Sequence, residues 1–152
     1  QTLVKQRNAY WLSDRLEEIG RLLPLKRDPR ITRRGYYFYG LRYDASEFAG
    51  LPKAEFVKAL GAEGLPVGEG YGRPIQNNPV FQQMRDARGR LLYAKTRTPN
   101  SDRICSETQV TIGHTALLSR ELVEAFAIGV ARIKAYAPQL AARSRGKARL
   151  AG

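Results

Sequence analysis

The stretch from Leu60 to Phe81 reads LGAEGLPVGEGYGRPIQNNPVF, and it decides how the middle of the chain folds. Glycine tolerates positive φ and close approach to the backbone, so the pair Gly61 and Gly64 predicts the end of a helix. A short strand is predicted over residues 65–67, followed by a loop over residues 68–79 in which three glycines surround one tyrosine. We expect this loop to present side chains outward rather than to fill the core.

Hydrophobic periodicity predicts helices on both sides of that loop. Apolar residues recur at helical spacing over residues 1–23, which Pro24 ends, and over residues 52–63. A third helix is predicted over residues 120–136, with Ser119 as its cap and Pro138 after it; its apolar stripe consists of Leu122, Val123, Phe126, Val130 and Ile133.

Two further stretches predict strands. Residues 36–43 are rich in aromatic residues, and residues 110–114 carry β-branched ones. The resulting order is helix, strand, helix, strand, strand, helix. This order predicts an α+β domain of two layers, with helices packed on one face of a small, largely antiparallel sheet.

The sequence predicts one domain, a C-terminal tail and a peripheral insertion. We expect one domain over residues 1–138, and a basic, disordered tail over residues 139–152, which consists largely of Ala, Arg, Ser and Gly. Residues 80–98, with a turn at Arg88–Arg90, read as a peripheral insertion. The chain begins with Gln1 inside a predicted helix, so we expect it to be a fragment of a longer polypeptide.

Composition excludes several classes of protein. The 152 residues contain no run of about 18 apolar residues, which a membrane-spanning helix would need. The single cysteine, Cys105, excludes an internal disulfide and a cysteine-rich metal site, and a reducing cytoplasm is the expected location.

The net charge of +12 comes mostly from arginines spread along the chain. A solvated, arginine-rich surface is the simplest interpretation, because net charge concerns association rather than fold. The alternatives are a phosphate-bearing substrate, an acidic partner domain, or a free-standing basic module that binds nucleic acid or another polyanion.

An ordered series of short motifs carries a resemblance to a known family. The series is Tyr36–Asp44, Phe48–Lys53, Ala59–Gly64, Gly70–Pro74, Cys105–Glu107 and His114–Leu118. It resembles the C-terminal small domain of the DegT/DnrJ-type sugar aminotransferases, which depend on pyridoxal phosphate. The resemblance covers residues 1–136.

The resemblance implies a fold, a cofactor and partners. It implies the small domain of a fold-type-I aminotransferase, whose first helix, here residues 1–23, links it to a large domain that holds pyridoxal phosphate. That large domain would belong to the same polypeptide or to a separate chain, and the intact enzyme would be a homodimer. The implied reaction is amino transfer from an amino acid to a keto sugar or keto-cyclitol.

The chain lacks the lysine that such chemistry requires. The cofactor is held as a Schiff base on a lysine amine, with a carboxylate facing the pyridine nitrogen. None of the seven lysines stands in the setting that the resemblance implies for it; they are Lys5, Lys26, Lys53, Lys58, Lys95, Lys134 and Lys147. We therefore predict no catalytic, cofactor-binding or metal-binding residue here, and no transamination by this chain alone.

The glycine-flanked loop supplies the candidate substrate-binding residues, Tyr71, Arg73 and Asn77. A phenol and a guanidinium can hydrogen-bond sugar hydroxyls, a phosphate or a carboxylate. The resemblance implies that this loop looks toward the cleft between the two domains. The structural alternative is a plain turn with a packed Tyr71 and a solvated Arg73.

Other candidates have simpler interpretations. The G-x-G-x-G spacing at residues 68–72 does not match a dinucleotide loop, because Arg73-Pro74 follows where a helix should begin. His114 is the only histidine, and we expect it to bond a nearby backbone group. Cys105 is expected to be buried and inert. The aromatic residues over 36–43 could stack on nucleic-acid bases, but alternation on a half-buried strand explains them better.

Overall fold

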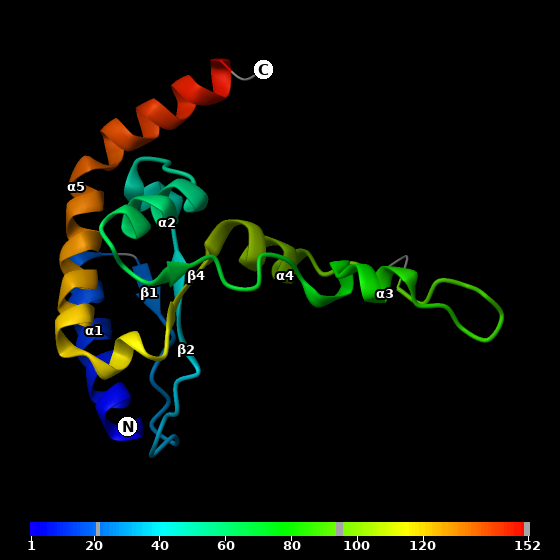
Figure 1. Cartoon of the computed structure of the whole chain (residues 1–152), viewed down its shortest axis with the longest axis horizontal. Helices are drawn as coiled ribbons and strands as arrows, with labels where there is room; N and C mark the ends of the chain where they lie inside the picture. The colour runs from blue at the N-terminus through cyan, green and yellow to red at the C-terminus, as the bar shows by residue number, and fades with distance from the viewer. Residues whose placement is uncertain (21, 94–95, 151–152) are drawn as a thin grey trace.

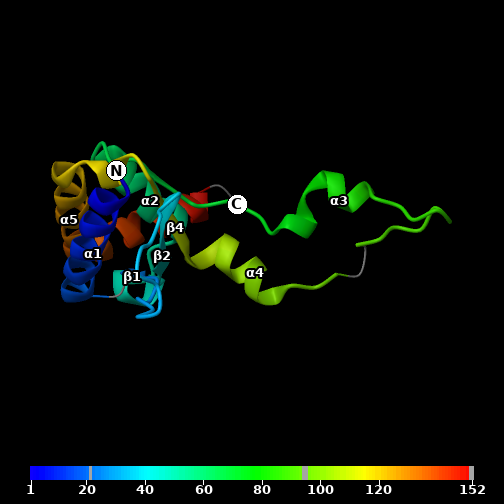
Figure 2. The ribbon, with the colours of Figure 1, turned by 90° about the horizontal axis from the view of Figure 1, so that it is seen from below.

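The computed structural model describes residues 1–20, 22–93 and 96–150, with side chains as far as residue 147. Four strands form one antiparallel sheet in the order β1-β2-β4-β3. They are β1 (Leu22–Pro24), β2 (Phe38–Tyr43), β3 (Val67–Gly68) and β4 (Gln109–Gly113). Three main helices, α1 (Thr2–Ile19), α2 (Lys53–Ala62) and α5 (Arg120–Leu150), pack on one side of the sheet (Figures 1 and 2). The predicted α+β class with helices on one face is confirmed.

The sheet buries only one of its faces. Along β2 the side chains of Tyr39, Leu41 and Tyr43 are buried, while Arg42 between them is exposed. The register places Tyr39 opposite Ile112 of β4, which is also buried. Since successive side chains of a strand point to opposite faces, the other face of the sheet is left open.

Helices α1 and α5 cover the buried face and supply a large share of the core. Leu12 and Leu16 of α1 are fully buried, and Phe126 and Val130 of α5 are at most 2% exposed. Each such burial stabilises the fold by about 1.5–3 kcal/mol. Leu122, placed on the same stripe by the sequence pattern, is instead 38% exposed.

An aromatic cluster fixes α2 against the end of β2. The rings of Tyr43, Phe48 and Phe56 lie with their centroids 4.6–5.0 Å apart. The Tyr43 hydroxyl donates to the Leu51 carbonyl at 2.7 Å, so its polar end is satisfied inside the core. Burial raises the pKa of both Tyr43 and Tyr39, because it disfavours the charged phenolate.

The first helix ends earlier than its sequence pattern predicts. It stops at Ile19 because Gly20 takes a φ of 93°, which turns the chain back toward the sheet. Leu22 then pairs with Tyr43 as part of the edge strand β1. The prediction of a helix to residue 23 is wrong for this reason.

The last helix continues beyond its predicted end. Pro138 lies inside α5, and the described residues 139–150 are helical, so the predicted disordered tail is absent from the structure as far as residue 150. Ala137 and Ala141, on either side of the proline, are buried. Figure 1 shows α5 changing direction toward its C-terminal end, the bend expected when proline removes a helical hydrogen bond. None of the described helices, this long one included, is apolar enough to cross a membrane.

Residues 74–103 form an arm that projects from the open side of the sheet (Figures 1 and 2). Its two short helices are α3 (Pro79–Gln83) and α4 (Pro99–Arg103). At the far end, Arg85 and Leu91 form an antiparallel bridge around a turn at Gly89. The stretch that reads as a peripheral insertion is therefore an extended structure with little core of its own.

Candidate functional site

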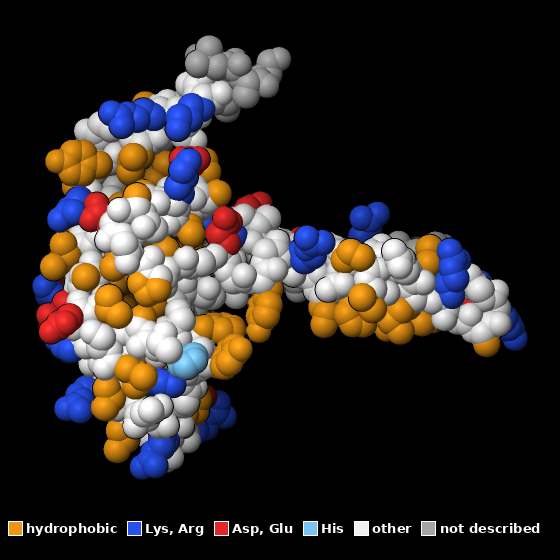
Figure 3. Space-filling model, in the orientation of Figure 1, with side chains coloured by type: hydrophobic (Ala, Val, Ile, Leu, Met, Phe, Trp, Pro, Cys, Tyr) orange, Lys and Arg blue, Asp and Glu red, His pale blue; other side chains and the backbone are white. Residues whose placement is uncertain are grey.

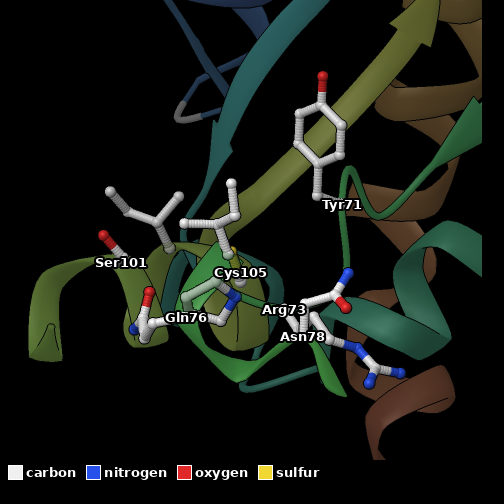
Figure 4. A pocket seen from close by; sticks show the side chains of 9 residues that line it. Tyr71, Arg73, Gln76, Asn78, Ser101 and Cys105 are labelled. Carbon is white, nitrogen blue, oxygen red and sulfur yellow. The ribbon is translucent and has the colours of Figure 1, made fainter. Parts of the chain in front are cut away.

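A pocket of about 510 Å³ lies where the arm leaves the body (Figure 4). One wall comes from the glycine-flanked loop and the start of the arm, and the other from the arm's returning segment. Its lining residues are Tyr71, Arg73, Pro74, Ile75, Gln76, Asn78, Ser101, Ile104 and Cys105. A volume of this size suits a small-molecule ligand.

Glycine conformations explain how the loop reaches this place. Gly70 and Gly72 have φ values of 75° and 71°, in the left-handed region that glycine adopts without strain. A Cβ atom at Gly70 would lie 2.4 Å from Oε1 of Gln109, so the loop passes directly over the start of β4. Pro74 then begins the short 3-10 helix Ile75–Asn77 and fixes the direction in which the arm leaves.

Tyr71 stands between the pocket and the open face of the sheet. Its ring is 74% exposed and contacts Phe38 edge-on, with the centroids 5.9 Å apart. The same ring borders a second, smaller hollow of about 180 Å³ beside Phe38 and Thr111. In Figure 4 the Tyr71 hydroxyl points away from the Gln76 and Ser101 side chains.

The structure brings Tyr71 and Arg73 to one pocket but leaves Asn77 outside its lining. The Asn77 side chain donates to Asp102 at 3.2 Å and so joins the two segments of the arm. Its neighbour Asn78 lines the pocket instead, and its side chain caps α3 by accepting from the Val80 amide at 3.1 Å. The sequence Asn78-Pro79 carries that capping signal, because proline is favoured in a first helical turn.

The second wall contains residues that sequence patterns do not single out as ligand contacts. Ser101 lies in α4, and Ile104 and Cys105 lie in the π-helical turn Ile104–Thr108 that follows it. Cys105 is only partly buried and faces the pocket, so the expectation of a buried thiol is wrong. No sequence signal marks Ser101, because its place depends on how the arm returns to the sheet.

Arg73 is the only charged residue among the nine that line the pocket. The other polar groups are a phenol, two amides, a hydroxyl and a thiol, which can hydrogen-bond hydroxyls, carbonyls or an anionic group of a ligand. The lining has no carboxylate, histidine or lysine to move a proton or form a Schiff base. The lining can therefore hydrogen-bond a ligand, but it does not fit pyridoxal phosphate as a covalently held cofactor.

The lone histidine has a structural environment. Nδ1 of His114 lies 3.3 Å from Nζ of Lys5, and the ring stacks on Tyr37 with centroids 6.1 Å apart. The partner is thus a lysine of α1 and not the backbone group that we expected. Within the described ranges, no group of three or more His, Cys, Asp or Glu side chains could hold a metal ion.

The excess positive charge is distributed rather than gathered. On the face shown in Figure 3, the Lys and Arg side chains are spread over the body, the arm and the last helix. Several arginines are also paired with carboxylates, among them Arg27 with Asp14 and Arg132 with Glu63. Arg30 lowers the pKa of Asp28 by hydrogen bonding, and Arg90 does the same for Asp86.

Searches against known proteins identify relatives. The chain is 30% identical, over 126 residues, to a protein of Micromonospora echinospora named L-glutamine:3-amino-2,3-dideoxy-scyllo-inosose aminotransferase; the match covers 76% of this chain and 30% of that one. A protein of the same name from Streptomyces kanamyceticus is 38% identical over 76 residues, covering 49% of this chain and 18% of the relative. No family model matches the chain.

A solved structure supports the same relationship. The crystal structure of 3-amino-5-hydroxybenzoic acid synthase, a DegT/DnrJ-type enzyme, superposes with a TM-score of 0.67 and 25% identity. This chain is related to the DegT/DnrJ-type aminotransferases. The superposition covers 88% of this chain but only 34% of the synthase. The chain thus spans about a third or less of the length of the relatives it matches.

Proposed function

We propose that this chain is the small domain of a pyridoxal-phosphate-dependent aminotransferase that acts on a keto sugar or keto-cyclitol. In this proposal it closes the active-site cleft and supplies substrate contacts from Tyr71 and Arg73. The domain comprises residues 1–138, with α1 as the link to a large domain. The observation that carries the proposal is the 30% identity over 126 residues to a protein named as an inosose aminotransferase, of which only 30% is matched.

The pocket at the base of the arm supports the substrate role. The arm that lines it leaves the body on the side of the sheet that the chain's own helices leave uncovered (Figure 2). Its one cation and several neutral hydrogen-bonding groups suit a polyhydroxylated ring with a carbonyl. Asn77 contributes by tying the two segments of the arm together through its bond to Asp102, so we assign it a structural part rather than direct contact.

The cofactor would be held elsewhere, by a large domain in the same polypeptide or in a separate chain. The environments of three lysines support this. Lys53 is buried against Cys105 and Glu69, Lys134 donates to backbone carbonyls of Ile19 and Gly20, and Lys5 contacts His114. An amine that forms a Schiff base needs access to the cofactor aldehyde. The single free cysteine favours a reducing, cytoplasmic location for the enzyme.

The arm supports a homodimer for the intact enzyme. Its apolar side chains gather along one side in Figure 3, and five are 38–72% exposed: Ile75, Val80, Met84, Leu91 and Leu92. Contiguous exposed apolar surface of this kind marks a protein interface. A second copy is the partner that we propose for it.

Two experiments test the proposal. In the first, the isolated chain is mixed with pyridoxal phosphate, and we expect no borohydride-trappable adduct at any single lysine. In the second, the chain replaces the matching third of the Micromonospora aminotransferase. The proposal predicts that this chimera transfers the amino group of L-glutamine to 3-amino-2,3-dideoxy-scyllo-inosose. A chimera that folds, binds the cofactor and has no activity toward any keto-cyclitol or keto sugar would reject it.

The alternative is a free-standing basic module that binds nucleic acid or another polyanion. The net charge of +12 is the observation in its favour. The pairing of several arginines with carboxylates counts against it, because paired groups contribute less to phosphate binding. A salt-dependent, micromolar affinity for DNA would favour this alternative.

A further inference from the structure

Lys53 is the one charged residue that is buried in the described part of the chain, with 3% of its side chain exposed. It is the first residue of α2, where a positive charge opposes the helix dipole. Burying an ammonium group also costs free energy unless partners compensate. Neither helix stability nor solvation therefore favours a lysine at this position. The interactions of its ammonium group with its partners must compensate for both costs.

Those partners come from two segments that are distant in sequence. Nζ of Lys53 donates to the carbonyl oxygen of Cys105 at 2.6 Å and lies 3.2 Å from Oε2 of Glu69. The Cys105 carbonyl belongs to a π-helical turn, an irregular backbone that is common at functional sites. Glu69 stands two residues before Tyr71 in the glycine-flanked loop. Hydrogen bonds to a charged donor are the stronger ones in proteins.

The two partners hold opposite walls of the pocket. Cys105 lines one wall together with Ser101 and Ile104, while Glu69 leads directly into the other wall at Tyr71. On the arm side, the bonds from Gln76 to Thr98 and from Asn77 to Asp102 also join the two segments. Lys53 joins the same two segments at the base of the arm, through Cys105 and Glu69.

We propose that Lys53 is a positioning residue that fixes the separation of the two pocket walls and so places Tyr71 and Arg73 relative to Ser101 and Cys105. That the pocket receives the amino acceptor rests on the proposed function, whereas the clamp between the walls does not. Lys53 touches no substrate in this proposal; it acts through the two backbone segments that it ties together.

The test uses the sole cysteine of the chain as a reporter. Cys105 is partly buried in the pocket wall, so its alkylation rate with neutral iodoacetamide measures how often that wall opens. In the full 152-residue chain, Lys53→Met should speed alkylation by roughly tenfold or more, since a charge-assisted bond is lost. Hydrogen exchange at Val67 and Gly68 of β3, the paired strand that leads into Glu69, should accelerate as well.

Two further variants separate clamping from general destabilisation. Val130→Ala removes methyl groups from the core of α5, outside the pocket lining, and should leave alkylation within about twofold at temperatures well below unfolding. Glu69→Gln keeps the shape of the side chain but removes its charge, and it should accelerate exchange at Val67 and Gly68 without speeding alkylation.

The proposal is overturned if Lys53→Met leaves both rates unchanged, or if Val130→Ala reproduces its effects. If Lys53→Met fails to fold, the Glu69→Gln variant decides the question, and unchanged exchange at Val67 and Gly68 would then overturn the proposal. None of these measurements uses a substrate. An inactive chimera would therefore reject the proposed function while leaving the clamp intact.

Discussion

Gly70 and Gly72 form a matched pair with which the loop geometry can be tested. Both residues have φ values near 70–75°, so alanine at either position meets the same backbone strain, about 1–2 kcal/mol. They differ in their surroundings. The Cβ atom of an alanine would lie 2.4 Å from Oε1 and 2.5 Å from Cδ of Gln109 at position 70, but would meet nothing within 4 Å at position 72.

The difference between the two variants isolates the crowding. Overpacking of this kind costs about 1–3 kcal/mol. Because the crowded atoms are the far end of a flexible side chain, we expect the lower part of that range. Gly70→Ala should therefore reduce the free energy of unfolding by about 1 kcal/mol more than Gly72→Ala does.

A double-mutant cycle with Gln109→Ala tests whether the Gln109 side chain causes the crowding at position 70. Urea unfolding is followed through the fluorescence of Trp11, the only tryptophan. Removing the Gln109 side chain should restore about 1 kcal/mol in the Gly70→Ala background and nothing measurable in the Gly72→Ala background. If Gly70→Ala and Gln109→Ala are additive, the loop does not pass over β4 as described, and the placement of Tyr71 is wrong.

Two more predictions concern stability and association. Burial raises the pKa of Tyr39 and Tyr43, so the folded state keeps these protons at a pH at which the unfolded state loses them. The free energy of unfolding should therefore be constant below about pH 10, as far as these two groups are concerned, and should decline above it. The double variant Tyr39→Phe with Tyr43→Phe should flatten that decline in urea titrations at alkaline pH. Val80→Ser with Leu92→Ser on the arm should weaken self-association in sedimentation experiments. The control pair Leu25→Ser and Ile128→Ser lies outside the arm, is at least as exposed, and should not weaken self-association. Equal effects of the two pairs would show that the arm is not the interface.

The sequence predicts those parts of the fold whose signals are local. The alternation over residues 38–43 and the apolar spacing in α1, α2 and α5 mark the two layers, because burial on one face enforces those periods. Edge strand β1 escapes prediction because Leu23 continues the helical spacing of Leu16 and Ile19, whereas in the structure Gly20 already ends the helix. The continuation of α5 escapes for the opposite reason: Pro138 signals an end, but the burial of Ala137 and Ala141 favours helix on both sides of it.

In the candidate site, too, only the residues with a local sequence signal could be predicted. Tyr71 and Arg73 are predictable because glycines and Pro74 mark a projecting loop around them. Asn77 and Asn78 are neighbours in sequence, and only the 3-10 turn at Ile75–Asn77 decides which of them faces the pocket. Ser101, Cys105 and the clamp at Lys53 depend on contacts between segments that are not adjacent in sequence, such as those of Lys53 and Cys105, which are 52 residues apart, and a single sequence carries no signal for such contacts.

The most direct test of the account is the effect of Arg73→Ala in the chimera with the Micromonospora aminotransferase. Its guanidinium is the only charge in the pocket lining, and the loss of a charge-assisted bond of about 1.5–3 kcal/mol should lower kcat/KM toward the amino acceptor roughly ten- to a hundredfold. The melting temperature should not change, and Arg145→Ala, an exposed arginine of α5 outside the pocket lining, should leave the rate intact. Full kcat/KM in the Arg73→Ala chimera would show that the loop is only a turn and that the pocket at the base of the arm does not hold the substrate.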